Sequence, residues 1–312
     1  MKQLSIVFKN SSGHFRAGWR ILFYFILFVT LSELNEFLYK SFLLINGDTL
    51  SDYTLLYNRF TDKTLKLLSV LLPALILLKF VDKRPIGLLG LSLYKGVVKE
   101  LSIGMAIGFF LGIVSVLITY FVGLGSFNLN NISIELIIYV LAVLIILIIS
   151  AVYEEILFRG YIFQSSIEGT NFFITLFIIS LLFGASHLDN EGINIYTILF
   201  TISAGVLLGI MYYRIRALWM CIGTHFVWNW LIGPVFGMEL EQSPFIHNSI
   251  FTFESSQSVL IGSANSTGDI IQTAIFIALS IIIWRSKLFK PSDYNIMLWK
   301  NYPSHFENKV KT

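Results

Sequence analysis

Long apolar stretches constrain the fold of this chain more than any other feature of its sequence. A bilayer core of about 30 Å needs roughly 20 apolar residues for each helix that crosses it. The sequence therefore predicts an all-α, polytopic membrane protein with about eight transmembrane helices. The eight stretches that approach this length are about 21–45, 66–82, 100–122, 134–153, 171–188, 194–213, 218–236 and 269–285.

The composition agrees with this fold class. Of the 312 residues, 55% are hydrophobic and only 13% are charged, whereas about 25% of the residues of soluble domains are charged. The shortage of charge extends along the whole chain, so we expect a single integral-membrane domain over residues 1–312, placed in the cell membrane among lipids. The net charge of +3 comes mostly from basic connections, so it does not indicate a nucleic-acid partner.

The distribution of lysine and arginine predicts the orientation of the chain, because basic residues gather in cytoplasmic connections. With the N-terminus inside, the inner connections and the C-terminal tail are basic, and only Arg59, Lys63 and Lys66 break the pattern. The outer connection 123–133 carries no charge. The other long outer stretch, 237–268, is rich in Ser, Asn and Gln, and we expect a mobile connection there. Both termini are therefore predicted to be cytoplasmic.

Glycines at helical spacing predict close contacts between helices. Gly104, Gly108 and Gly112 fall at every fourth residue, as do Gly205 and Gly209. Small residues at this spacing let helix backbones approach one another in lipid. We therefore expect a compact bundle.

The first polar cluster is Glu154-Glu155 with Arg159, inside an apolar run that continues to Gly169. Ionisable residues are costly in a membrane, and they usually mark a functional site there. Residues four apart share a helix face, so Glu155 and Arg159 are predicted to form an ion pair. Glu154 points about 100° away and lacks a basic residue at that spacing. We expect Glu154 to serve as a general base.

The second and third polar clusters repeat a four-residue spacing. His225 and Asn229 would present an imidazole and a carboxamide on one face, and both groups can donate hydrogen bonds to a developing oxyanion. Phe183 and His187 have the same spacing. We expect Phe183 to wall the His187 side of a cavity.

The heights of these clusters can be compared through a predicted hairpin, whose turn is near residues 169–171. Glu154 and His187 lie at similar numbers of residues from this turn, so at about 1.5 Å per residue they can face each other across the hairpin. The height of His225 agrees only if residues 159–170 protrude into the cytoplasm. This interpretation places the site in the inner half of the membrane.

The three clusters, in this order, resemble the motifs of the CPBP family (CAAX protease and bacteriocin-processing, also called Abi). The first family motif is two glutamates, three variable residues and an arginine. The second is a phenylalanine and a histidine four residues later, and the third is a histidine followed four residues later by an asparagine or aspartate. The resemblance extends over about residues 134–234, with the catalytic motifs inside 150–234, and no motif position departs from it.

The resemblance implies an eight-helix intramembrane endopeptidase of the type II CAAX prenyl endopeptidase kind, with a site open to the cytoplasm. It implies that Glu154 activates water with help from His187, and that His225 and Asn229 form the oxyanion hole. Glu155 and Arg159 would support the site. The implied partner is a peptide or protein substrate, which could carry a lipid.

A zinc-dependent version of the same protease is an alternative. Glu154, His187 and His225 could hold Zn²⁺ and leave its fourth position to water. The chain has no His-Glu-x-x-His helix, in which two ligands share a face and a separate glutamate is the base. We favour a mechanism without a cofactor and keep zinc as the alternative.

Two hypotheses in which the protein is not an enzyme also remain. Intramembrane Glu, His and Arg side chains build relays in transporters, but residues 1–130 hold no second copy of the motifs, as an inverted repeat would require. A bacteriocin-immunity scaffold that only binds its target is the other reading. The intact set of motifs argues against it.

Overall fold

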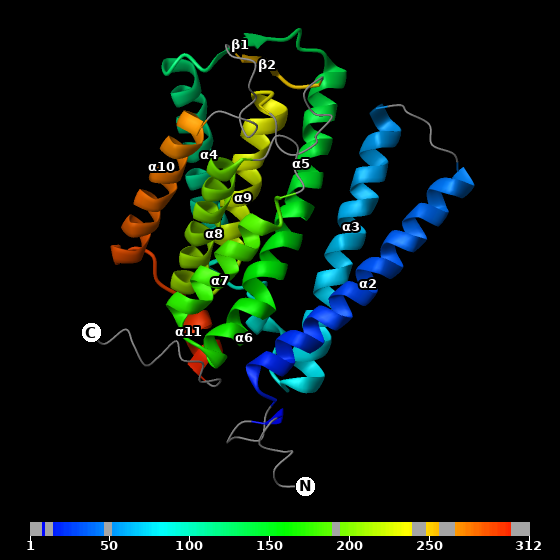
Figure 1. Cartoon of the computed structure of the whole chain (residues 1–312), viewed down its shortest axis with the longest axis vertical. Coiled ribbons are helices and arrows are strands. Elements are labelled where there is room, and N and C mark those ends of the chain that lie inside the picture. Colours follow the sequence, from blue (N-terminus) through cyan, green and yellow to red (C-terminus); the bar gives the residue numbers. More distant parts are fainter. Residues whose placement is uncertain are drawn as a thin grey trace. The chain divides into compact units, whose positions relative to one another are not determined.

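The structure is a computed structural model that describes residues 8–9, 15–46, 52–188, 194–238, 248–255 and 266–300. It is all-α, as predicted, apart from a two-stranded sheet (Figure 1). The helices are α2 (Ala17–Asn46), α3 (Asp52–Ile76), α4 (Val97–Phe121), α5 (Ile134–Glu155), α6 (Ile162–Gly169), α7 (Phe172–Ala185), α8 (Ile195–Ile215), α9 (Trp219–Trp230), α10 (Ser266–Arg285) and α11 (Asp293–Lys300). Three π-helical segments, Leu77–Val81, Ile156–Tyr161 and Leu231–Val235, extend α3, α5 and α9, and a 3-10 turn covers Ile86–Leu89.

The helices identify a multi-pass membrane protein, but the predicted number of eight spans was wrong. Within the described residues, six helical stretches are long and apolar enough to cross a membrane. Many large apolar side chains on these stretches are exposed, as expected for surfaces that face lipid. The six are Ala17–Ser41, Leu56–Val81, Val97–Phe121, Ile134–Gly169, Ile195–Ile215 and Gly268–Arg285.

The other two predicted spans are helical but short. In the stretch 171–188, α7 has 14 residues, which is about 21 Å of helix, against a bilayer core of about 30 Å. In the stretch 218–236, α9 has 12 residues and then changes to a π-helical segment that contains Pro234. An apolar run in a sequence does not show where the helix inside it stops, and this caused the error.

The chain divides into two compact units, which are described separately. Unit 1 contains residues 1–94, 152–175 and 291–312, and unit 2 contains residues 95–151 and 176–290. The single membrane domain over residues 1–312 stays a prediction.

In unit 2, the predicted glycine contacts join α4 to α9. A Cβ atom added at Gly104 or Gly108 would overlap the backbone carbonyl oxygen of Met220 or Thr224, and one added at Gly112 would lie 2.8 Å from Cδ1 of Leu231. The prediction of close helix packing at these glycines is thus confirmed. The same holds at Gly205 of α8, where an added Cβ would lie 3.0 Å from the Cα of Ser180 in α7.

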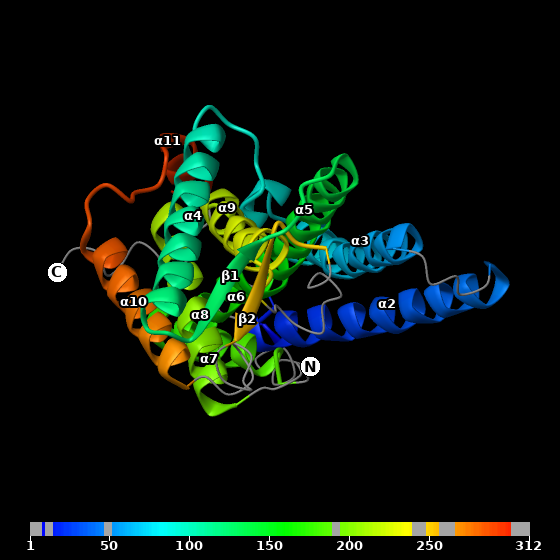
Figure 2. The same ribbon diagram turned by 90° about the horizontal axis from the view of Figure 1, so that it is seen from above.

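Unit 2 also contains the sheet, which the sequence did not predict. Strands β1 (Gly125–Leu129) and β2 (Phe251–Ser255) pair antiparallel, with Phe127 opposite Phe253 (Figure 2). These two rings pack on a small apolar cluster around Ile232. The predicted mobile connection 237–268 therefore contains an ordered strand, while its segments 239–247 and 256–265 lie outside the described residues.

In unit 1, α2 and α3 lie side by side in both views (Figures 1 and 2), and α6 also packs on α2. The buried Tyr24 of α2 joins these contacts. Its hydroxyl donates to the carbonyl oxygen of Val70 in α3 at 3.1 Å, and its ring stacks on Tyr161 with a centroid distance of 5.4 Å. This packing surrounds the segment that carries the first polar motif.

Candidate active site

The first motif lies where α5 changes into a π-helix. The predicted helix does continue to Gly169, but residues Ile156–Tyr161 form a π-helical segment, and all six of them are buried. A π-helical turn inside an α-helix is rare and occurs frequently at functional sites. It inserts an extra residue into the turn. The angular positions of the following residues about the helix axis, including that of Arg159, are therefore not given by the usual 3.6-residue period.

The predicted ion pair between Glu155 and Arg159 is present. Nη1 of Arg159 lies 3.2 Å from Oε1 of Glu155, and both side chains are completely buried. A buried charge needs a partner of opposite sign, so each side chain compensates the other. Glu154 is half-buried. It precedes Glu155 within α5, so its side chain leaves the helix about 100° away from that of Glu155.

In unit 2, the second motif fixes the ring of His187. This residue follows the end of α7, and its Nδ1 lies 2.8 Å from the carbonyl oxygen of Phe183. Because a carbonyl oxygen only accepts, we assign the proton of the neutral imidazole to Nδ1, which makes Nε2 the basic nitrogen. The ring of Phe183 packs against that of His187 with a centroid distance of 5.0 Å.

The same phenylalanine connects the second motif to the third. The ring of Phe183 meets that of His225 edge to face, with a centroid distance of 6.2 Å and an interplanar angle of 76°. Phe183 does lie beside His187, while its role as the wall of a cavity stays a prediction. Its contact with His225 brings the second and third motifs together within unit 2, which the spacing alone did not show.

Helix α9 presents His225 and Asn229, and its position is fixed from two sides. Next to His225, the hydroxyl of Thr224 donates to the carbonyl oxygen of Gly104 in α4 at 3.1 Å. Next to Asn229, Nε1 of Trp230 donates to the carbonyl oxygen of Val140 in α5 at 3.2 Å. His225 and Asn229 are both half-buried and lie one turn apart on the same helix face.

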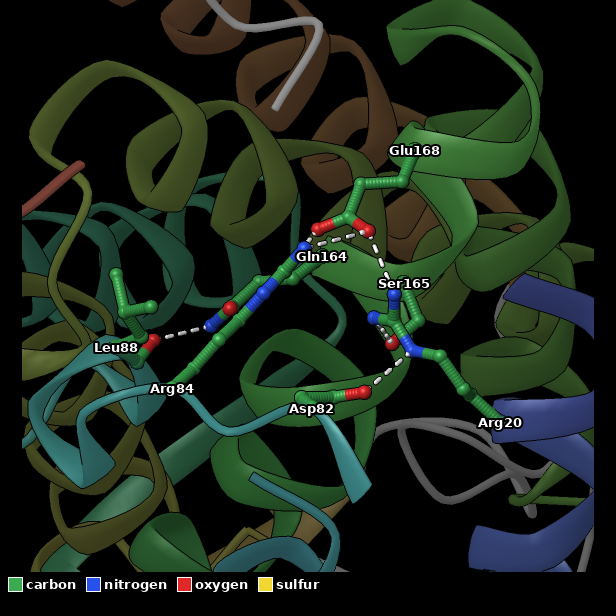
Figure 3. Close-up of polar contacts among 7 residues, drawn as sticks. All are labelled: Arg20, Asp82, Arg84, Leu88, Gln164, Ser165 and Glu168. Carbon is green, nitrogen blue, oxygen red and sulfur yellow. Dashed lines mark hydrogen bonds and ion pairs between the residues drawn. The ribbon is translucent and has the colours of Figure 1, made fainter. Parts of the chain in front are cut away.

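The sequence analysis missed a buried network of charges in unit 1 (Figure 3). Arg20 of α2 and Arg84 both pair with Glu168 of α6, and Arg20 also pairs with Asp82. The segment 159–170 is largely buried and packs on α2. Its predicted protrusion into the cytoplasm stays a prediction. Burial raises the pKa of the Asp82 carboxyl, and the neighbouring guanidinium of Arg20 opposes this shift.

The structure thus places the predicted site residues in two groups. Glu154, Glu155 and Arg159 belong to unit 1, whereas Phe183, His187, His225 and Asn229 belong to unit 2. The meeting of Glu154 with the two histidines stays a prediction. In the part of the chain that the structure describes, no group of three His, Cys, Asp or Glu side chains is close enough to hold a metal ion. The zinc ligand set of Glu154, His187 and His225 draws on both units, so it stays a prediction too.

Comparison with known proteins agrees with the resemblance seen in the motifs. Residues 136–231 match the family model described as "Type II CAAX prenyl endopeptidase Rce1-like". A protein of Bacillus subtilis (strain 168), named "Putative membrane peptidase YdiL", is 32% identical over an alignment of 140 residues, and the match covers 41% of this chain and 55% of that relative. The match therefore spans about half of the relative's length. Residues 136–231, which contain all three motifs, are thus similar to the Rce1-like type II CAAX prenyl endopeptidases.

Proposed function

We propose that this chain is an intramembrane endopeptidase that hydrolyses a peptide bond near the cytoplasmic surface of the membrane. The observation that carries the proposal is the different placement of the two glutamates within the segment that matches the family model. Glu155 is committed to Arg159, while the half-buried Glu154 lies on a different side of the same helix. In unit 2, one phenylalanine contacts both histidines.

In the proposed reaction, Glu154 acts first as a general base. Its carboxylate takes a proton from a water molecule, whose oxygen attacks the carbonyl carbon of the scissile peptide bond. His187 assists by accepting the second water proton in a hydrogen bond at Nε2, because Nδ1 is held by the carbonyl oxygen of Phe183. When the tetrahedral intermediate collapses, the C–N bond breaks and Glu154 returns its proton to the leaving nitrogen.

His225 and Asn229 stabilise the negative charge that develops on the carbonyl oxygen. An imidazole N–H and a carboxamide N–H on one helix face can donate to the same oxygen. Donors of this kind are effective when they are already in place before the reaction. The close packing of α9 on α4 through Gly104 and Gly108 supports such preorganisation.

The proposed substrate is a peptide or protein that reaches the site from the membrane, with or without a lipid attached. A free cofactor is not required. We also propose that both termini are cytoplasmic. Reporter fusions test this, since a fusion at residue 128 should read outside and one at residue 90 or 300 inside. An outside signal at residue 300 contradicts the proposed orientation.

The decisive experiment is the cleavage of a peptide library by protein purified in detergent, with Glu154→Gln beside the wild type. We expect the wild type to cleave and Glu154→Gln to lose cleavage while it stays folded. Glu135→Gln is the matched control, because Glu135 is an exposed carboxylate at the start of the same helix, α5, and it should cleave as the wild type does. Full activity of Glu154→Gln, or a wild type that cleaves nothing, rejects the proposal.

The same assay decides between water activation by glutamate and by zinc. Without a metal, dialysis against a strong chelator leaves the activity unchanged. If chelation abolishes cleavage and added Zn²⁺ restores it, the protease proposal stands, but Glu154 becomes a metal ligand rather than the base.

A further inference from the structure

Four charged side chains form a compact, balanced network in unit 1 (Figure 3). Nε of Arg20 lies 2.9 Å from Oδ1 of Asp82, and its Nη1 lies 2.7 Å from Oε2 of Glu168. Arg84 reaches both carboxylate oxygens of Glu168, with Nη2 donating to Oε2 at 3.2 Å. Two arginines face two carboxylates, so the network carries no net charge and has no excess charge to offer a ligand.

The network is in direct contact with the π-helical segment Ile156–Tyr161. The guanidinium of Arg20 lies over the ring of Tyr161, 5.9 Å from its centroid, and Nη2 of Arg20 donates to the hydroxyl of Ser165 at 2.8 Å. A Cβ atom added at Gly160 would lie 3.0 Å from Cδ1 of Leu89, so the turn after Arg84 also packs closely on this segment. The side-chain amide of Gln164 donates to the carbonyl oxygen of Leu88.

The loop that supplies Asp82 and Arg84 has an unusual backbone. Lys83, between them, has a φ of 53°, in the left-handed region that a side chain with a Cβ seldom adopts. The flanking amides are fixed, because those of Asp82 and Arg84 each donate at 2.8 Å, to the carbonyl oxygens of Leu77 and Leu78. A strained residue persists only where its surroundings determine it. The loop is thus held in a form in which Arg84 reaches Glu168 of α6 and Asp82 reaches Arg20 of α2.

Stability alone does not require such a network. Replacing a buried ion pair by apolar side chains of similar volume is often neutral or stabilising, and in some proteins buried ion pairs serve to define a geometry. The geometry that needs definition here is rotation. After Glu155 the backbone is π-helical, so the 3.6-residue period no longer determines how α6 is rotated about the helix axis relative to α5. Contacts outside the helix must therefore fix α6, and with it the direction of Arg159 and the backbone that follows Glu154.

We propose that Glu168, held by Arg20 and Arg84, is a positioning residue that fixes the π-helical segment in the rotation that presents Glu154 to the substrate. This inference rests on the proposed peptidase function for its kinetic consequence. Its structural consequence, a fixed segment Ile156–Tyr161, is measurable without any activity.

Two variants test the proposal. Glu168→Gln removes one carboxylate and leaves the two arginines with Asp82 as the one carboxylate of the network. Arg84→Lys keeps every charge, so it should fold, but an ammonium group cannot bind both carboxylate oxygens in the fixed geometry of a guanidinium. The matched control is Glu36→Gln, which removes one carboxylate from an exposed ion pair with Lys40 on α2.

The first measurement is hydrogen–deuterium exchange of the peptide that covers residues 152–161, well below the melting temperature. We expect exchange to become at least about twofold faster in both variants and to stay unchanged in Glu36→Gln. The second measurement is the cleavage rate. We expect kcat to fall by roughly 10-fold to 100-fold with little change in KM, since small misplacements of a catalytic group cost about this much.

Unchanged exchange over residues 152–161 in folded Arg84→Lys would overturn the proposal, and so would an equal change in Glu36→Gln. If both variants only lower the melting temperature while kcat and exchange of the folded protein stay at wild-type values, the network is merely structural and the proposal fails. If the wild type shows no cleavage at all, the peptidase function fails, while the exchange result still decides whether Glu168 fixes this segment.

Discussion

The two units hold their motif residues in physically different ways. In unit 1, charges surround the motif, since Glu155 pairs with Arg159 and the network around Glu168 fixes the helix beyond it. In unit 2, close packing holds the third motif in place. Helix α9 contacts α4 at glycines where a methyl group would overlap the backbone of α9. The comparison teaches that the same kind of substitution should have different consequences in the two units.

The reason lies in what each kind of contact tolerates. An ion pair in a buried site fails when one partner is neutralised, because the other charge then has no compensation. A close contact between helix backbones is indifferent to charge but fails when a single carbon is added. Unit 1 should therefore be sensitive to Glu→Gln changes at its buried ion pairs, and unit 2 to Gly→Ala changes at its close helix contacts.

The largest expected effect is the loss of stability in Glu155→Gln. This change leaves the guanidinium of Arg159 completely buried beside a neutral amide, and breaking a buried pair costs about 3–5 kcal/mol. The free energy of unfolding of Glu154→Gln should lie within a few tenths of a kcal/mol of the wild-type value, because this change leaves the ion pair intact. Thermal melting of both variants in detergent measures the difference. Equal melting temperatures would show that the two glutamates do not divide their roles as proposed.

Much of this arrangement could be predicted from the sequence, because it depends on local periodicity. The ion pair of Glu155 with Arg159, the contact of Phe183 with His187 and the packing of Gly104 and Gly108 were all predicted from a spacing of four residues. The ion pair forms although Arg159 lies in the π-helical segment. The end of the long helix at Gly169 was also predicted correctly.

The remaining features depend on information that periodicity does not contain. The pairing of Arg20 with Glu168 joins residues 148 positions apart. Strand β1 likewise pairs with β2, which lies far from it in the sequence. An apolar run gives an upper limit for a helix, not its end, so the predicted span at 171–188 included the turn that holds His187. The π-helical segment is a departure from the very period on which the prediction relied.

The next effect concerns catalysis in unit 2. Asn229 is predicted to act only on charge that develops in the transition state, so Asn229→Ala should lower kcat by about 10²–10³-fold with little change in KM. The melting temperature should change little, because α9 is held by contacts of its neighbours Thr224 and Trp230 instead. Steady-state kinetics of the purified variant measure this. A raised KM with an unchanged kcat would assign Asn229 to substrate binding and remove it from the oxyanion hole.

The smallest effect tests the contribution of shape, with one substitution made in both units. Gly108→Ala places a Cβ against the backbone of Thr224, whose Cα would be 3.1 Å away, and overpacking of this kind typically costs about 1–3 kcal/mol. Gly18→Ala in α2 is the control, because no atom lies within 4 Å of its added Cβ. Alanine favours a helix over glycine by up to about 1 kcal/mol, so Gly18→Ala should be neutral or slightly stabilising. Because Thr224 adjoins His225, Gly108→Ala should also reduce kcat, whereas Gly18→Ala should not. If the two variants melt and cleave alike, close packing of α4 on α9 does not fix the third motif, and the contrast between the units fails.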